Sequence, residues 1–140
     1  MATGYATLYG DMCGGYNALK DVYKTQVFDL AKWRNTQNKV IPENIISKPP
    51  TAELKDNQKD EDSLPNYNDL DKILKMILEE KKSSQDIINA SDFDPQTVKK
   101  IAHLIKISEY KRRQAPPGVK ISRLAFGRDR RLPLVSGYNL

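Results

Sequence analysis

The stretch YNDLDKILKMILE, residues 67–79, carries the clearest periodic pattern of the chain and decides its fold class. Apolar residues recur at spacings of three and four, and charged residues fill the positions between them, as on an amphipathic helix. The apolar face consists of Tyr67, Leu70, Ile73, Leu74, Ile77 and Leu78. Asn66 or Asn68 is a suitable residue to cap the first turn. We therefore predict a helix that packs one face against a core.

Two more helices are predicted after this one. Ser83–Ala90 has the composition of a short helix, and Asp94-Pro95 starts a longer one, with Asp as the N-cap and Pro at the first helical position. Apolar residues at helical spacing then continue to about Tyr110. His103, the only histidine, falls inside this apolar stripe, so we expect it to be packed or half-buried.

The segments before residue 67 indicate loops and short helices. Residues 4–15 are rich in Gly and Tyr and predict a loop. A helix is predicted from Lys24, with Thr25 capping its first turn and the cluster Asn35–Asn38 ending it, and a short helix from Pro42 to Ile46. Few segments have the pattern of a strand, so the chain taken alone is predicted to be mostly α.

Two segments are predicted to lack regular structure. Residues 51–65 hold almost no apolar residues and many charges, which predicts an exposed, mobile loop. The run Asp60-Glu61-Asp62 within it is expected to be solvated. Pro116-Pro117-Gly118 breaks the last helix, and residues 115–140 are predicted to form an extended basic tail.

Composition and charge set limits on function. The 140 residues are enough for one domain, and 39% are hydrophobic and 29% charged, which fits a globular protein. No apolar run reaches the roughly 18 residues that a membrane span needs. Cys13 is the only cysteine, so an internal disulfide is impossible. The net charge of +5 is uneven, because residues 51–94 are acidic and the part from Pro95 onward is strongly basic. This asymmetry indicates an anionic partner for the tail, or pairing with the acidic segment.

Three separated blocks, in the same order, resemble one enzyme family. They are YGDMCGGYNALKDVYKTQV (9–27), IPENIISKPPTAEL with QKDEDSLP (41–54 and 58–65), and EYKRRQAPPGVKIS with AFGRDRR (109–122 and 125–131). Together they resemble the NAD synthetases, and most closely the bacterial, glutamine-dependent type. The resemblance implies that residues 1–140 are the C-terminal portion of the synthetase domain, a Rossmann-like α/β domain of the adenine-nucleotide α-hydrolase type. The ATP-binding SGGxDS loop and the glutaminase domain of that family are not found in these residues.

The resemblance also implies a reaction. Members of the family amidate nicotinic acid adenine dinucleotide (deamido-NAD) to NAD: ATP adenylates the nicotinate carboxylate, and ammonia from glutamine displaces AMP. The resemblance implies ATP as a substrate, Mg²⁺ for the full enzyme, a homodimer and a cytoplasmic location, with no membrane or nucleic acid as partner. Because the SGGxDS loop is missing, we expect the isolated chain to be inactive.

Six residues match positions that bind ligands in this family. Lys24, Thr51 and Asp11 match ATP contacts, with Thr51 at the start of the 51–65 segment, which closes over ATP as a lid. Lys111, Asn17 and Tyr110 match contacts to deamido-NAD, although Tyr110 stands where shorter members have His. The resemblance places no catalytic residue in this chain, and the metal ligands of the family lie upstream of Met1.

Lys24 also attracts attention without the resemblance. The first turn of a helix has a positive potential, which disfavours a lysine there unless an anion is bound. A bound phosphate would remove this conflict.

Two other hypotheses come from different classes. The predicted helix Ser83–Ala90 and the basic helix after it have the order of a helix-turn-helix, whose residues Lys99, Lys100 and Lys106 would face the phosphates of a nucleic acid. Alternatively, the chain is a non-catalytic, vestigial fragment.

Overall fold

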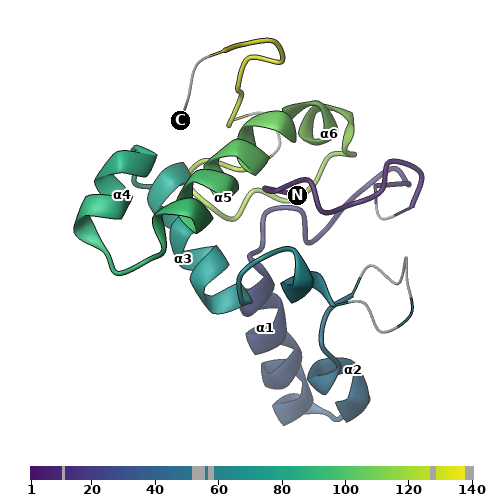
Figure 1. The fold of residues 1–140 in the computed structure, drawn as a ribbon. Coiled ribbons are helices and arrows are strands. Elements are labelled where there is room, and N and C mark those ends of the chain that lie inside the picture. The colour runs from purple at the N-terminus through teal and green to yellow at the C-terminus, as the bar shows by residue number, and fades with distance from the viewer. Residues whose placement is uncertain (11, 52–55, 57–58, 127–128, 138–140) are drawn as a thin grey trace. The chain divides into compact units, whose positions relative to one another are not determined.

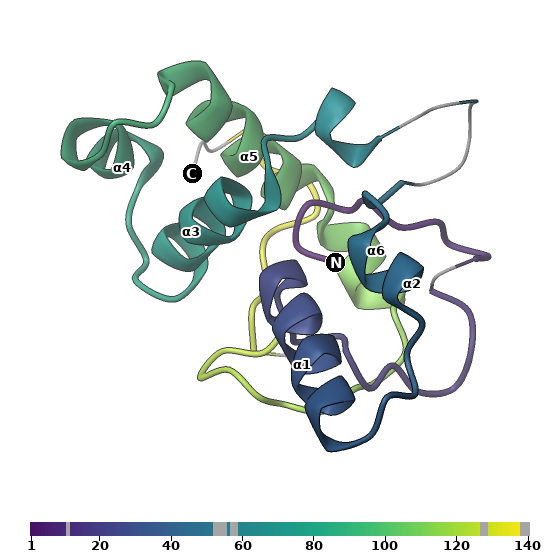
Figure 2. The ribbon, with the colours of Figure 1, turned by 90° about the horizontal axis from the view of Figure 1, so that it is seen from below.

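The computed structural model describes residues 1–10, 12–51, 56, 59–126 and 129–137. These residues form helices joined by loops and contain no β-strand (Figures 1 and 2). The helices are α1 (Lys24–Gln37), α2 (Glu43–Ser47), α3 (Tyr67–Leu78), α4 (Ser84–Ala90), α5 (Pro95–Ile107) and α6 (Glu109–Gln114), with a short 3₁₀ turn, η1, at Asp60–Asp62. The prediction of a mostly helical chain is therefore confirmed for the described residues.

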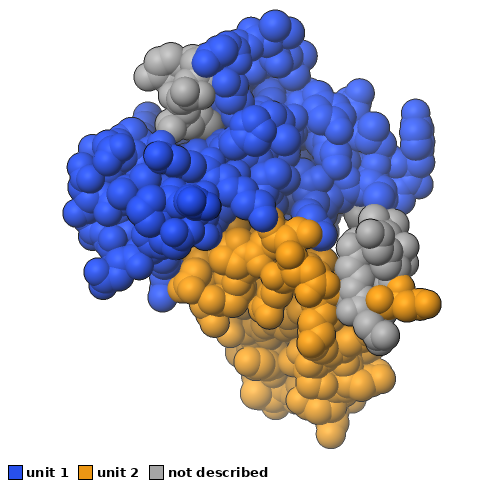
Figure 3. All heavy atoms as spheres, viewed as in Figure 1, with its two compact units in different colours: residues 1–21, 72–140 blue, residues 22–71 orange. Residues whose placement is uncertain are grey.

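The chain divides into two compact units, which Figure 3 shows in different colours. The first unit consists of residues 1–21 and 72–140, and the second of residues 22–71. The boundary falls inside α3, between Asp71 and Lys72. Each unit is described separately below.

The core of the first unit is built by α4, α5 and the part of α3 that belongs to it. Its fully or almost fully buried apolar side chains are Ile73, Leu74, Ile87, Val98, Ile101, Ala102 and Ile105. The predicted start of α5 is confirmed, since the Asp94 carboxylate accepts a hydrogen bond from Thr97 N at 2.7 Å and Pro95 is the first helical residue. Capping and the apolar stripe thus agree on where this helix begins and which face it buries.

Two details of this region differ from the sequence predictions. The helix ends at Ile107 rather than near Tyr110, because Ser108 leaves helical geometry (φ −88°, ψ 0°) and α6 starts after it. His103 is exposed, not packed. The buried face of α5 consists of residues 98, 101, 102 and 105. His103 follows Ala102 and is therefore rotated about 100° from it around the helix axis, away from the buried face.

In the second unit, α1 begins at the predicted residue but with a different cap. Tyr23 is the N-cap, and Thr25 does not cap with its side chain as predicted. Instead, the Thr25 N–H donates to Asp71 Oδ2 at 2.9 Å, so a carboxylate from α3 satisfies this end of the helix. The helix ends at Gln37, inside the predicted Asn35–Asn38 cluster.

Residues 59–64 are more ordered than their charge suggested. Asp60 and Leu64 are buried, and Asp60 Oδ2 accepts a hydrogen bond from the Tyr67 hydroxyl. The expectation that the Asp60–Asp62 run is solvated is therefore wrong for Asp60, because η1 turns this carboxylate toward α3. Residues 52–55 and 57–58 lie outside the described residues, and the mobility of the 51–65 segment stays a prediction. The predicted cap of α3 is confirmed, since Asn66 Oδ1 accepts from Asp69 N at 3.0 Å.

Candidate functional site

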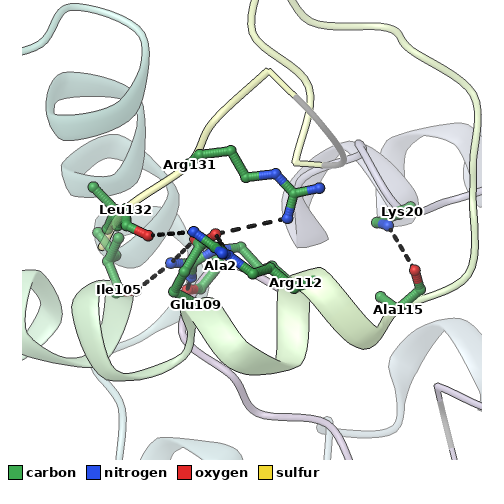
Figure 4. A network of polar contacts seen from close by, with 9 residues as sticks. Ala2, Lys20, Ile105, Glu109, Arg112, Ala115, Arg131 and Leu132 are labelled. Carbon is green, nitrogen blue, oxygen red and sulfur yellow. Dashed lines mark hydrogen bonds and ion pairs between the residues drawn. The ribbon is translucent and has the colours of Figure 1, made fainter. Parts of the chain in front are cut away.

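A cluster of charged side chains gathers on α6 in the first unit (Figure 4). Glu109 and Arg112 are almost completely buried, with 1% and 3% of their surface exposed. Glu109 Oε2 accepts from Arg112 Nε at 3.1 Å, and Oε1 lies 3.0 Å from Arg113 Nε and 3.7 Å from Arg131 Nη1. One carboxylate therefore faces three guanidinium groups, and the cluster keeps an excess of positive charge.

The arginines of this cluster also bind backbone carbonyls from both ends of the chain. Arg112 donates to Ala2 O at 2.6 Å and to Ile105 O, while Arg113 Nη2 donates to Leu132 O at 2.9 Å. Burial lowers the pKa of Arg112, and the neighbouring Glu109 opposes this shift. Because arginine starts from a very high pKa, the group remains a cation.

Lys111, predicted to bind the dinucleotide, holds the N-terminal segment. Its Nζ donates to Gly4 O at 2.6 Å and to Ala6 O at 2.8 Å. Gly4 has a φ of +70°, and a Cβ atom there would lie 2.2 Å from Ser108 Oγ. The close approach of these residues therefore requires a glycine. An ammonium group has three donors, and two of those of Lys111 bind these carbonyls of the described N-terminal segment.

The other two residues predicted to bind the dinucleotide also lie in the first unit. Tyr110 is exposed on α6. Asn17 is half-buried, and its backbone N–H donates to Pro117 O at 2.8 Å. The structure therefore joins the Asn17 loop directly to residues 115–126 of the tail, which contain no helix.

Lys20 and Asp21, which the sequence analysis did not select, make most of the other contacts to this tail. Lys20 Nζ donates to Pro116 O at 2.8 Å and to Ala115 O at 3.3 Å. Burial lowers the pKa of Lys20, and the nearby Arg131 lowers it further. The carboxylate of Asp21 accepts hydrogen bonds from the backbone N–H groups of residues 121, 122 and 126 and from the Ser122 hydroxyl.

The pKa of Asp21 reflects these contacts. Burial by itself would raise it, but the hydrogen bonds from Ser122, Ile121 and Phe126 more than offset this, and the pKa lies below its ordinary value. Asp21 therefore stays ionised in a buried position.

The residues predicted to bind ATP fall outside the first unit or outside the described residues. Lys24 is the first residue of α1, and its Nζ lies 5.7 Å from the centroid of the Phe28 ring and 5.9 Å from that of Tyr67. Thr51 is half-buried in the second unit. Asp11 lies outside the described residues.

Sequence reasoning missed Lys20, Asp21, Glu109 and Arg112 for a physical reason. Charged residues are seldom fully buried, so nothing in the runs LKD (19–21) and EYKRR (109–113) marked these side chains as buried. The available signal was the position of Glu109 three and four residues before Arg112 and Arg113, a spacing at which opposite charges pair on a helix. Lys20 and Asp21 bind the tail backbone instead, and no local pattern indicated this.

Comparison with known proteins identifies the family of this chain. The sequence model of the family described as NAD synthase matches residues 1–115. The chain belongs to the NAD synthase family. It is 55% identical, over 99% of its length, to glutamine-dependent NAD(+) synthetases from Xanthomonas campestris pv. campestris and Acinetobacter baylyi. The chain spans about a quarter of the length of these relatives, 25% and 26% respectively.

Solved structures agree with this membership of the NAD synthase family. A glutamine-dependent NAD⁺ synthetase from Acinetobacter baumannii in complex with ADP is 46% identical with a TM-score of 0.51, covering 96% of this chain and 23% of that protein. One from Cytophaga hutchinsonii is 19% identical with a TM-score of 0.63, over 97% of this chain and 23% of that chain, and supports the fold alone. The predicted fold class is thus confirmed: the chain is a mostly helical part of the Rossmann-like α/β fold of the NAD synthetases.

Membership of the NAD synthase family also bears on the helix-turn-helix alternative. The two helices of the proposed helix-turn-helix exist as α4 and α5, but both lie inside the stretch that matches the NAD synthase family. We therefore do not pursue a nucleic-acid-binding function. Within the described ranges, no group of three His, Cys, Asp or Glu residues could hold a metal ion, and no helix is long and apolar enough to cross a membrane.

Proposed function

We propose that these residues are part of a glutamine-dependent NAD(+) synthetase, which uses ATP and glutamine-derived ammonia to convert deamido-NAD to NAD. The observation that carries this proposal is the 55% identity over 99% of the chain to two relatives of that name. An identity this high over almost the whole chain is difficult to reconcile with a different substrate.

The reaction explains why the chain needs ordered cations. A carboxylate is a poor electrophile, and adenylation gives it a good leaving group. Two polyanionic nucleotides must then come together, and positive groups must neutralise phosphate charge where it develops. We propose that Lys111, whose ammonium group is held by two backbone carbonyls, supplies part of this charge.

For deamido-NAD we propose Lys111, Asn17 and Tyr110 as contacts. Two features support this assignment. The carbonyls of Gly4 and Ala6 hold the Lys111 ammonium group in place, and Tyr110 is exposed on the same helix. A cation that is already ordered loses little conformational entropy when it binds a ligand.

For ATP we propose Lys24, Thr51 and Asp11. The Asp71 carboxylate already places a negative charge at the start of α1, beside Lys24. A phosphate is therefore not needed to relieve the helix dipole. What supports Lys24 is its position at a helix N-terminus together with the motif it belongs to.

Further features of the whole enzyme remain proposals. We propose that residues 1–140 form the C-terminal portion of the synthetase domain, that residues 51–65 close over ATP, and that residues 115–140 form its basic tail. We also propose a cytoplasmic homodimer that requires Mg²⁺. The described residues offer no metal cluster, so no step is assigned to Mg²⁺ here, and none of them is assigned a catalytic role.

The test compares the chain alone with a chimera. In the chimera, these 140 residues replace the matching quarter of the Acinetobacter baylyi relative. NAD formation is measured with deamido-NAD, ATP, Mg²⁺ and either glutamine or ammonia. We expect turnover by the chimera and none by the chain alone. A folded chimera that makes no NAD with either nitrogen source would contradict the proposed function and favour a vestigial, non-catalytic sequence. Turnover by the chain alone would show that the SGGxDS loop is dispensable.

A further inference from the structure

Two neighbouring side chains of the first unit bind backbone groups of one tail segment: Lys20 binds carbonyl oxygens, and Asp21 binds N–H groups. Lys20, with 7% of its surface exposed, takes the carbonyl oxygens of residues 115 and 116. Asp21, with 2% exposed, takes the N–H groups of residues 121, 122 and 126. Figure 4 shows Lys20 directed at Ala115. A cation on carbonyls and an anion on amides are each charge-assisted, and such bonds are stronger than neutral ones.

The charged groups of Lys20 and Asp21 hydrogen-bond to the backbone of the tail rather than pairing with each other. No salt bridge joins Lys20 and Asp21 in the described part of the chain, and each binds backbone groups of the tail. A tail with no regular hydrogen bonds of its own needs such partners where it runs close to other segments. The pair therefore supplies hydrogen-bond partners for five backbone groups of this segment, at residues 115, 116, 121, 122 and 126.

The same tail segment touches the loop that carries Asn17. The Asn17 N–H donates to Pro117 O at 2.8 Å. A Cβ atom on Gly118 would lie 2.3 Å from Asn17 O, so the two backbones approach as closely as a glycine permits. Asn17 is thus held between its own loop and the tail.

We propose that Lys20 and Asp21 are positioning residues that fix the tail against residues 17–21 and so orient Asn17 toward the dinucleotide. We call this pair the tail clamp. The role of the tail clamp in binding rests on the proposed function, whereas its effect on the tail does not. If the tail clamp has this role, loosening the tail weakens binding of deamido-NAD and leaves binding of ATP largely unchanged.

The first test measures amide hydrogen exchange in the 140-residue chain. Asp21→Asn keeps the shape of the side chain but removes its charge and replaces one acceptor oxygen by a donor. We expect exchange at residues 121, 122 and 126 to accelerate about 10- to 100-fold. Lys20→Met should accelerate exchange at Asn17, and Lys20→Arg should restore part of the protection. Asp92→Asn and Lys99→Met change exposed charges of the same unit and serve as controls that should leave exchange unaltered.

A milder variant guards against loss of folding. Ser122→Ala removes only the hydroxyl that donates to Asp21 at 3.0 Å, and should accelerate exchange at residue 122 by about 2- to 5-fold. If Asp21→Asn and Ser122→Ala both leave exchange in the tail as in the unmodified chain, the tail clamp does not exist.

The second test measures kinetics in the chimera defined above. Asp21→Asn is expected to raise KM for deamido-NAD about tenfold, with KM for ATP and kcat changed less than about twofold. Faster exchange with an unchanged KM for deamido-NAD would overturn the positioning role and leave the tail clamp purely structural. An unmodified chimera without activity would refute the proposed function, and the positioning role with it, while the exchange result would still decide whether the tail clamp exists.

Discussion

Replacing Glu109 by Gln should be among the most destabilising conservative changes in this chain. Glu109 is 1% exposed, and its carboxylate is the only acidic group contacting Arg112 in the described residues. Gln keeps the shape but cannot balance the charge of a guanidinium that is 3% exposed. Breaking one side of a buried ion pair costs about 3–5 kcal/mol. The more exposed partners of Glu109, Arg113 and Arg131, add at most about 1 kcal/mol each.

The assay is urea unfolding of the 140-residue chain, followed by far-UV circular dichroism. With an m value of about 1–3 kcal/mol per M, a loss of about 3 kcal/mol lowers the midpoint by about 1 M or more. Glu80→Gln is the matched control, because Glu80 pairs with Lys82 at 2.7 Å on the surface. We expect the control to change stability by less than about 1 kcal/mol.

The result that would refute the reasoning is a Glu109→Gln variant whose free energy of unfolding equals that of the control. In that case the buried carboxylate would not stabilise the cluster on α6. A double variant sharpens the test. Adding Arg112→Met to Glu109→Gln removes the uncompensated charge, so the Arg112→Met change should cost less in the Glu109→Gln variant than in the unmodified chain. It should not restore full stability, because the Ala2 and Ile105 carbonyls lose their donor.

Three more predictions follow from single contacts. Gly4→Ala should lower the free energy of unfolding by about 1–3 kcal/mol, measured by thermal unfolding, because Gly4 has a positive φ and no space beside Ser108. Gly15 has open space around it, so Gly15→Ala should change the free energy of unfolding by less than about 1 kcal/mol. Asp21 has a lowered pKa in the folded chain, so its contribution to the free energy of unfolding is present above the unfolded pKa of about 3.9 and is lost as the pH falls through the folded pKa. Asp21→Asn should therefore flatten the plot of unfolding free energy against pH in that acid range. Equal slopes for the two proteins would contradict this. Lys24→Ala in the chimera should lower kcat about 10- to 100-fold by removing a charge-assisted phosphate contact, and wild-type steady-state rates would exclude that role.

Local patterns predicted a large part of the helical structure. The Asp94-Pro95 start of α5 and the Asn66 cap of α3 were confirmed, because capping depends on residues a few positions apart. The apolar stripe around Ile101 was also confirmed, because helical periodicity selects one face for the core. The sequence could not show that Ser108 interrupts the last helix, since that break serves contacts to Gly4 and Ala2, which lie more than 100 residues away in the chain.

The candidate site was predicted only where motifs marked it. Lys111 and Asn17 were named from the resemblance, and their roles as ligand contacts stay predictions. Lys20, Asp21, Glu109 and Arg112 were not named, because the burial of a charged side chain depends on partners that tertiary structure brings together.

The sequence by itself determined where most of the helices lie, the caps of α3 and α5, and the family to which the chain belongs. These follow from short-range hydrogen bonding, from helical periodicity and from motifs written directly in the residues. Only the tertiary structure decided where the charges go. In the folded chain, Asp71 accepts a hydrogen bond at the start of α1, and Lys111 donates to carbonyls of the N-terminal segment. Asp21 accepts hydrogen bonds from backbone amides of the tail. Each of these contacts joins residues distant in sequence, and the partner of a buried charge is set by what the fold places within hydrogen-bonding distance.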